Sequence, residues 1–351
     1  MSTGNGGDAL APIEVTGNRM KMRPRWIPTI EYTVQNMMIS MATIVAACAS
    51  LFFTSMVVLP LAFTRALFSR RSLTLLPPPA SLKRGKVVLI VGASRGIGLE
   101  VLKQYCPEPG TTVIAVSKNA DSMRNALIQL GDTPATLQME TIDLAGSPKA
   151  IAEAISILDE KYGPISHLYA ISGISNHLKD GTPWNVDVAE QMIRVNVSGT
   201  VAMAMTMYER MKGRKYGKIC IVGSVAGLFS PANMITYAST KAFINNFSTS
   251  LRVLASASNI DVVTVEPGFI DTRMTQKMRG QGSTVPGLEF ASAESLASRM
   301  KSAVERGGVG VVSFPIRQSV MMSALKAVNP ICEEVGRYWS MKSGMAGKKI
   351  T

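Results

Sequence analysis

Three residues near the middle of the chain have the types and the spacing for acid–base chemistry. Tyr237 and Lys241 stand four residues apart in TYASTKAF, and Ser224 precedes Tyr237 by thirteen residues. A tyrosine hydroxyl, with a pKa of about 10, exchanges protons poorly at neutral pH unless a nearby cation favours the phenolate. Lys241 lies one helical turn further on and can supply that charge. Ser224 can then hydrogen-bond a substrate carbonyl, which makes these three the candidate catalytic residues.

Asn196 and the two histidines are the other polar candidates. Asn196 falls in an expected helix, where asparagine is a modest helix former, so it either positions a water in a proton relay or is a satisfied core amide. His167 and His177 do not complete a nucleophilic triad with Ser224, because no GxSxG turn precedes this serine. We interpret both histidines as structural.

A glycine-rich turn predicts a dinucleotide site. The apolar run KVVLIVG leads into GASRGIGLEVLKQY, which places Gly92, Gly96 and Gly98 between a strand and a helix. Glycine lets the backbone turn tightly and approach a pyrophosphate, and the helix N-terminus supplies unpaired N–H groups for it. The alternative is an ordinary loop, which the strand–turn–helix setting disfavours.

The residues after the second apolar run indicate which nicotinamide cofactor is bound. An NAD site has an Asp or Glu there for the ribose 2′-OH, whereas this chain has Ser117 and Lys118, with Arg95 inside the glycine turn. Two cations without a carboxylate favour the 2′-phosphate of NADPH over NADH, unless both are solvated surface charges. Asp143 either accepts from the adenine amino group or caps a helix.

The pattern of apolar runs from residue 86 onward predicts the fold. Most of the runs are nearly continuous in Val, Ile and Leu, as strands covered on both faces should be, and helical patterns fill the gaps. We therefore predict an α/β fold, a Rossmann-type doubly wound parallel sheet of about seven strands over residues 86–315. The seven runs are KVVLIVG, TTVIAVS, LQMETID, ISHLYAIS, KICIVGS, IDVVTVEPG and GVGVVSF.

Residues 86–315 resemble the short-chain dehydrogenase/reductase family in the glycine turn, in Asn196, Ser224, Tyr237 and Lys241 with their spacings, and in VEPGFIDT. The resemblance implies that Tyr237 is a general acid, that Lys241 lowers its pKa and binds the nicotinamide ribose, that Ser224 orients the carbonyl and that Asn196 holds a water. The predicted cofactor-binding set is Gly92, Ser94, Arg95, Gly96, Ile97, Gly98, Ser117, Lys118, Asp143, Asn196, Tyr237, Lys241, Pro267, Gly268 and Thr272.

Two positions depart from the family pattern. Where the family has Asn-Asn-Ala-Gly after the fourth strand, this chain has Ala170, Ile171, Ser172 and Gly173. The loss of both amides puts the local hydrogen bonding in doubt. The threonine that usually opens the glycine turn is Val91.

An apolar segment precedes the predicted sheet. No charged residue occurs from Tyr32 to Thr64, which is long enough to cross a bilayer and too long and too late for a signal peptide. We expect a disordered basic N-terminus at 1–31, a transmembrane helix or membrane-embedded hairpin at 32–64, and a basic, proline-rich linker at 65–85. The alternative for the apolar segment is a buried core helix.

The net charge of +13 does not predict nucleic-acid binding, because many of the basic residues flank the apolar segment, where they would meet lipid head groups. The four cysteines, Cys48, Cys106, Cys220 and Cys332, lack CxxC spacing, so we expect buried thiols and neither disulfides nor a metal site. The final residues KKIT resemble a di-lysine retrieval signal of endoplasmic-reticulum membrane proteins, which would place the catalytic domain in the cytosol; a frayed charged tail is the alternative.

Residues 316–351 are expected to form a helical extension and tail. In FPIRQSVMMSALKAVNP, the residues Val320, Met321, Ala324, Leu325 and Val328 recur at helical spacing, so this helix either packs on the core or forms a methionine-bearing lid. We expect the segment from about 274 to 291 to be mobile and to close over the substrate.

The sequence thus predicts a membrane-anchored, NADPH-dependent reductase of a lipophilic ketone, of the long-chain 3-oxoacyl, sphingoid, steroid or retinoid type. The alternatives are an NAD-dependent secondary alcohol dehydrogenase, a ketoreductase of secondary metabolism and a non-catalytic nucleotide-binding scaffold. Beyond the carbonyl substrate and the membrane, the family resemblance implies a homodimer or homotetramer.

Overall fold

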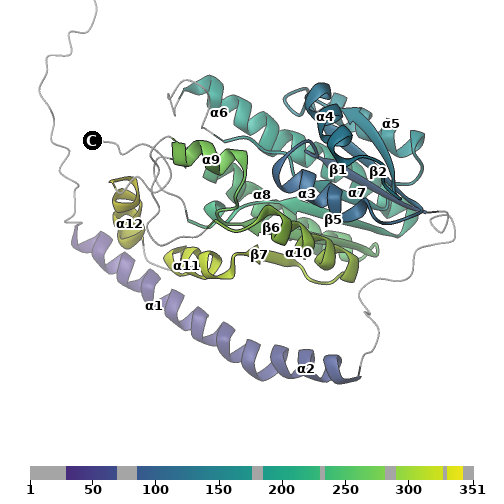
Figure 1. The fold of residues 1–351 in the computed structure, drawn as a ribbon. Coiled ribbons are helices and arrows are strands. Elements are labelled where there is room, and N and C mark those ends of the chain that lie inside the picture. The colour runs from purple at the N-terminus through teal and green to yellow at the C-terminus, as the bar shows by residue number, and fades with distance from the viewer. Residues whose placement is uncertain are drawn as a thin grey trace, which may run out of the picture.

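Seven parallel strands form one sheet at the centre of the domain that begins at residue 86 (Figure 1). A computed structural model describes residues 29–68, 85–175, 185–229, 234–280, 290–326 and 330–342. The strand order is β3-β2-β1-β4-β5-β6-β7, so the chain reverses its direction of travel across the sheet between β3 and β4. The predicted doubly wound fold is confirmed. The strands are β1 (Lys86–Val91), β2 (Thr111–Ser117), β3 (Thr136–Thr141), β4 (His167–Ala170), β5 (Gly217–Val222), β6 (Ile260–Pro267) and β7 (Val311–Phe314).

Helices cover both faces of the sheet, as crossover connections between parallel strands require. One layer consists of α3 (Gly96–Tyr105), α4 (Ala120–Leu130) and α10 (Ala293–Arg306). The other consists of α5 (Pro148–Lys161), α7 (Thr200–Arg214) and α8 (Ile235–Ser256), with α6 (Val186–Met192) leading through a π-helical turn into α7. Three further helices come from the C-terminal part of the chain, α9 (Arg273–Gly280), α11 (Ile316–Lys326) and α12 (Pro330–Lys342).

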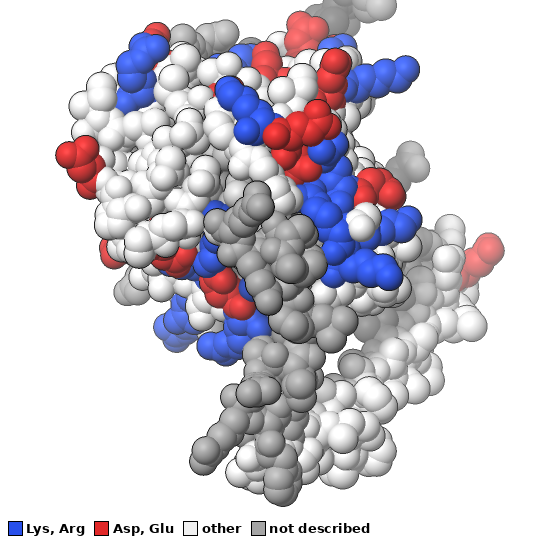
Figure 2. Space-filling model, turned by 90° about the vertical axis from the view of Figure 1, so that its right-hand side faces the viewer, with Lys and Arg blue, Asp and Glu red and all other residues white. Residues whose placement is uncertain are grey.

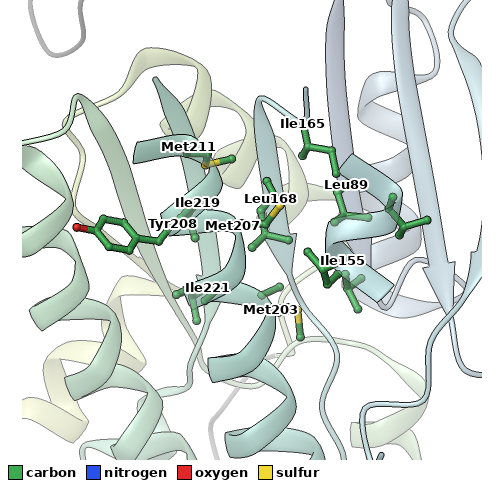
Figure 3. Close-up of a cluster of buried hydrophobic side chains, with 14 of the residues drawn as sticks. Leu89, Ile155, Ile165, Leu168, Met203, Met207, Tyr208, Met211, Ile219 and Ile221 are labelled. Atoms are coloured by element: carbon green, nitrogen blue, oxygen red, sulfur yellow. The ribbon is translucent and has the colours of Figure 1, made fainter. Parts of the chain in front are cut away.

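Aliphatic side chains and methionines fill the space between the sheet and the α5–α7–α8 layer (Figure 3). Leu89, Leu168 and Ile219 project from the strands, while Ile155 and Met207 meet them from the helices, and all five are fully buried. Burying a side chain of this size contributes about 1.5–3 kcal/mol each. This core fixes the strands from which the polar residues of the site extend.

The apolar segment near the N-terminus forms one helical rod, made of α1 (Ile30–Phe53), a π-helical turn (Thr54–Val58) and α2 (Leu59–Phe68). Ile30–Thr64 has the length and composition of a membrane span, and its most apolar stretch has no buried residue, so the segment is not a core helix. Its surface is nearly without charge, in contrast to the mixed charges of the domain that begins at residue 86 (Figure 2). The side-chain N–H of Asn36 donates to the Tyr32 carbonyl at 2.8 Å, while its side-chain oxygen is buried without a partner among the described residues.

The boundaries and the cysteines differ in detail from the predictions. The helix begins two residues before the predicted start at 32, because Thr29 caps it by accepting from the Tyr32 N–H. It continues to Phe68, beyond the predicted end at 64. Cys106 and Cys220 are buried as predicted, but Cys48 is exposed because it lies on this uncovered helix. Most of the predicted N-terminal tail and linker lies outside the described residues.

A buried polar cluster joins α10 to the amino ends of β1, β4 and β5. Glu305 accepts hydrogen bonds from Lys86 (2.7 Å) and from the Tyr105 hydroxyl (3.0 Å). The Lys218 ammonium and the His167 Nε2 each lie 3.7 Å from a Glu305 carboxylate oxygen. His167 is therefore structural, at the edge of the sheet opposite the carboxyl ends of the strands; His177 lies outside the described residues.

We expect Glu305→Gln to lower the free energy of unfolding at pH 7 by about 2 kcal/mol, because the half-buried Lys86 and the buried Lys218 lose their shared anionic partner. Burial favours a higher pKa for Glu305, but His167 and Lys86 outweigh it, so its pKa is lowered. A lowered pKa stabilises the fold above the unfolded value of about 4.5, and that stability is lost as the pH falls below it.

Chemical denaturation between pH 3 and pH 8 measures this effect. Glu294→Gln, an exposed carboxylate on the same helix, is the control and should change stability little. Equal losses in the two variants at pH 7 would contradict a stabilising role for the Glu305 cluster.

Candidate active site

Two positions of the glycine turn between β1 and α3, Gly92 and Gly98, have no space for a side chain. A Cβ on Gly98 would lie 2.0 Å from the carbonyl oxygen of Gly92, and Gly92 itself has φ +102°. The turn is held to the next strand by hydrogen bonds from the Gly92 and Ala93 N–H groups to the Val116 carbonyl, at 2.8 and 3.0 Å. The backbone of α3 therefore begins directly against the turn, with Gly96 and Ile97 at the helix start and Ser94 and Arg95 just before it. This cradle fits a dinucleotide pyrophosphate.

The end of β2 carries a cation and no carboxylate. The Ser117 hydroxyl donates a hydrogen bond to the Ser94 hydroxyl at 3.0 Å, and the Lys118 ammonium forms an ion pair with the Asp143 carboxylate at 2.9 Å. The hydrogen bond from Lys118 and that from the Ala145 N–H lower the pKa of Asp143. The helix-cap alternative for Asp143 is wrong, because Ser147 caps α5. Lys118 is exposed, which leaves its charge accessible to a ligand at the cavity rim.

Ser224, Tyr237 and Lys241 converge at the carboxyl end of β5. The Ser224 hydroxyl donates to the Pro267 carbonyl at 3.3 Å and accepts from the Ala226 N–H at 3.1 Å. The Lys241 ammonium donates to the Val222 carbonyl at 2.9 Å and lies 6.0 Å from the centre of the Tyr237 ring. The sequence spacing therefore brings all three candidate catalytic residues together.

Burial shifts the pKa values of Lys241 and Tyr237 in opposite directions. It lowers the pKa of Lys241 to about 8, because the ammonium is taken out of water without an anionic partner. It raises the pKa of the Tyr237 hydroxyl, and hydrogen bonding with Ser224 acts in the opposite direction. At neutral pH the tyrosine is protonated and the lysine is charged.

Asn196 lies in the π-helical turn Ile193–Gly199, which interrupts the helix from α6 to α7. Its side-chain oxygen accepts from the Ile174 N–H at 2.9 Å, and its amide donates to the Ile174 carbonyl at 2.9 Å and to Thr240 at 3.1 Å. The amide thus clamps the loop after β4 to α8. Turns of this kind occur often at functional sites, but no single residue type signals them in a sequence.

Backbone groups replace the amides missing from the loop after β4. The N–H groups of Ile171 and Ser172 donate to the Val91 carbonyl at 3.1 and 3.0 Å, which holds this loop against the glycine turn. Gly173 leaves room where a Cβ would lie 3.4 Å from both Asn196 and Lys241. The departure from the family pattern therefore leaves the loop in place.

One cavity of ≈ 380 Å³ is lined by the glycine turn, by Ser117, Lys118 and Asp143, by Ser224, Tyr237 and Lys241, and by Pro267, Gly268 and Thr272. Asn196 was predicted to bind the cofactor, but it is buried behind this lining and is not part of it. Part of the cavity wall is apolar. Met278 and Met322 come from the two segments that were expected near the substrate, whereas Phe229, Met234 and Phe269 were not predicted. Part of the segment expected to close over the substrate, 281–289, lies outside the described residues.

The C-terminal helix α11 packs on this wall, in agreement with one of the two arrangements expected for it. Met322 is buried against Val225 and Phe229. Val320, expected on the apolar face, is 62% exposed, whereas Gln318 and Ser319 are buried. The buried face of α11 thus includes two polar residues that the hydrophobic spacing did not predict.

The strand order, the glycine turn and the Ser–Tyr–Lys set at the strand ends define a nucleotide-binding oxidoreductase of the doubly wound class. Residues 86–282 match the family model described as short chain dehydrogenase. The chain belongs to this family of NAD(P)-dependent oxidoreductases acting on CH–OH and C=O groups.

Known relatives extend the match along the catalytic domain. A dehydrogenase/reductase SDR family protein 7-like of Anopheles gambiae is 30% identical over 246 residues, 66% of this chain and 76% of the relative. A 3-oxoacyl-acyl-carrier-protein reductase FabG of Salmonella typhimurium is 28% identical over 224 residues, 61% of this chain and 87% of the relative. Among solved structures, a short-chain dehydrogenase from Sphingobium yanoikuyae in complex with NADPH has a TM-score of 0.58 at 22% identity, covering 73% of this chain and 95% of that chain.

We expect Lys118→Ala to weaken NADPH binding roughly tenfold and NADH binding less than about twofold. Only NADPH carries a 2′-phosphate on the adenosine ribose, which the Lys118 ammonium would contact. Cofactor fluorescence titration measures both affinities. Lys212→Ala removes an exposed cation from α7, at the other edge of the sheet, and should change neither. A parallel loss for NADH and NADPH in Lys118→Ala would show that Lys118 does not read the 2′-phosphate.

Proposed function

We propose that the chain is an NADPH-dependent reductase of a lipophilic ketone, anchored in a membrane by Ile30–Thr64. The observation that carries the proposal is the composition of the one cavity. Ser224, Tyr237 and Lys241 line it together with the glycine turn and Lys118, and methionine and phenylalanine side chains contribute an apolar part of its wall. An apolar wall together with the polar groups of Ser224, Tyr237 and Lys241 suits a lipophilic carbonyl compound.

The cofactor would be held by the cradle described above. The turn at Gly92–Gly98 and the start of α3 would bind the pyrophosphate, while Lys118 and Arg95 favour NADPH over NADH. Lys241 would bind the nicotinamide ribose, with Pro267, Gly268 and Thr272 around the nicotinamide. When bound, the nicotinamide supplies the hydride for reduction of the carbonyl carbon.

Tyr237 would supply the proton to the carbonyl oxygen. Burial favours its protonated form, which is the form a general acid needs at neutral pH. The Ser224 hydroxyl would donate a hydrogen bond to the same oxygen and orient it. Lys241, charged below about pH 8, would stabilise the phenolate that remains after proton transfer.

Asn196 would support the relay that returns a proton to Tyr237. Its side-chain oxygen and nitrogen are both engaged by Ile174 and Thr240, so the amide positions the loop and the helix. The water-holding role implied by the family would then belong to the backbone of the π-helical turn, where a carbonyl leaves the regular helical pattern.

The substrate class rests on the apolar wall and on the relatives. Two relatives are described as a 3-oxoacyl-acyl-carrier-protein reductase and an actinorhodin polyketide ketoreductase, both of which reduce ketones. We assign this chain to the reduction of a long-chain 3-oxoacyl, sphingoid, steroid or retinoid ketone. The methionines at the wall accommodate flexible or irregular apolar shapes.

The location follows from the apolar rod and the C-terminal tail. Anchoring by Ile30–Thr64 and reading of the KKIT signal would place the protein in the endoplasmic reticulum, with the catalytic domain in the cytosol. The tail itself lies outside the described residues. Family resemblance suggests that the catalytic domains assemble as dimers or tetramers.

We expect Tyr237→Phe to reduce kcat for lipophilic ketones at least about 100-fold, because the proton donor is removed. The full chain in detergent is assayed for NADPH oxidation on a panel of such ketones, beside Tyr162→Phe, which removes a half-buried hydroxyl bound to Glu140. Retained activity in Tyr237→Phe would refute its role. Cofactor binding without turnover on the panel, in either direction, would favour the scaffold alternative.

We expect the wild-type chain to resist carbonate extraction from membranes. Ile44→Lys combined with Leu51→Lys should make it extractable, because each cation at the bilayer centre costs about 2.5–3.5 kcal/mol. Ile128→Lys is the matched control, since Ile128 on α4 is 70% exposed, similar to Ile44 (63%) and Leu51 (69%). Release of the wild-type chain by carbonate would contradict the anchor.

A further inference from the structure

Gln318 is a buried polar residue on α11, a helix whose neighbouring residues Ile316, Arg317 and Val320 face solvent. Only 3% of Gln318 is exposed. Its side-chain oxygen accepts a hydrogen bond of 2.7 Å from the N–H of Phe269, in the turn that follows β6. Burying an amide among apolar side chains costs free energy unless it is paired, so this contact is a specific one.

Gln318 lies so close to the turn that it restricts position 268 to glycine. A Cβ on Gly268 would lie 2.0 Å from the Gln318 oxygen and 3.3 Å from the Gln318 Cβ. An alanine at 268 would therefore displace the amide and break its bond to Phe269. Glycine is needed at 268 so that the α11 side chain can reach the turn.

The same turn reaches the candidate catalytic serine. The Gly268 N–H donates to the Phe314 carbonyl at 2.8 Å, which ties the turn to β7, and the Pro267 carbonyl accepts from the Ser224 hydroxyl at 3.3 Å. Gln318 thus fixes the residues next to Pro267. Gly268 and Phe269 also line the cavity, as does Met322, one turn along α11.

We propose that Gln318 is a positioning residue, through which the C-terminal helix α11 fixes the Pro267–Phe269 turn, the nicotinamide pocket and the Ser224 hydroxyl. The inference rests on the proposed function, in which this turn borders the nicotinamide and Ser224 orients the carbonyl. Gln318 touches neither substrate nor cofactor and acts by the bond to Phe269. Loss of that bond leaves the Phe269 N–H without a partner, and an unpaired N–H inside a fold costs free energy. We therefore expect the turn to shift until this N–H finds another acceptor.

The first test compares Gln318→Ala with Ser319→Ala in the full detergent-solubilised chain. Ser319 is the matched control, because it is similarly buried on the same helix and donates only within its own segment, to the Pro315 carbonyl at 3.4 Å. We expect Gln318→Ala to weaken NADPH binding and to lower kcat, each roughly tenfold. Ser319→Ala should leave both within about twofold, whatever either variant does to thermal stability.

A double-mutant cycle gives the readout that loss of stability alone would not produce. Gly268→Ala should weaken NADPH binding about as much as Gln318→Ala, since it displaces the same oxygen. The double variant Gly268→Ala/Gln318→Ala should be no weaker than either single variant, because truncating Gln318 makes space for the new methyl group. Additive losses across the cycle would overturn the proposal.

The affinity for NADPH is measured by fluorescence and needs no substrate, so it separates this proposal from the proposed function. The coupling between residues 268 and 318 can be present in a chain that reduces none of the ketones tried, in which case only the substrate assignment fails. Equal effects of Gln318→Ala and Ser319→Ala on NADPH affinity would sink the positioning role, even where ketone reduction is found.

Discussion

The parallel pairing of β1, β4, β5 and β6 is the constraint on which the candidate site depends. All four strands end at the same edge of the sheet, and the last carbonyl groups of three of them accept hydrogen bonds from the site. The Val91 carbonyl holds the loop after β4, the Val222 carbonyl holds Lys241, and the Pro267 carbonyl holds Ser224. Strand-end acceptors thus position groups that are far apart in the sequence.

Charged side chains are partnered differently at the amino ends and at the carboxyl ends of the strands. At the amino edge, the cations Lys86 and Lys218 each lie near the carboxylate of Glu305, and Lys86 also pairs with Glu108. At the carboxyl edge, Lys241 is buried against a carbonyl group alone, and its pKa is lowered to about 8. Burying a cation without an anionic partner costs free energy, so the carboxyl edge is destabilising where the amino edge is stabilising. If Tyr237 and Lys241 act as proposed, the same lack of screening water would strengthen the attraction between the Lys241 ammonium and a Tyr237 phenolate.

The sequence predicted those parts of the fold and site that depend on local spacing. The seven strands follow from apolar runs, and the Tyr237–Lys241 pair and the glycine turn follow from short motifs. The apolar cavity wall was not predicted in the same detail, because Phe229, Met278 and Met322 come from three separate segments and no period links them. Hydrophobic spacing also misplaced the buried face of α11: Gln318 is buried because it has a partner across the fold, and Val320 is exposed because it has none.

The connection between the apolar rod and the sheet has a consequence for where the enzyme can work. The rod ends at Phe68 and β1 begins at Lys86. A chain of that length spans at most about 60 Å when fully extended. A rod held in a bilayer would therefore act as a tether, confining the cavity to a thin layer of water beside the membrane surface. If the substrate is a ketone dissolved in the lipid, as proposed, the cavity would meet it at a concentration set by its density in the membrane and not by the volume of the surrounding solution.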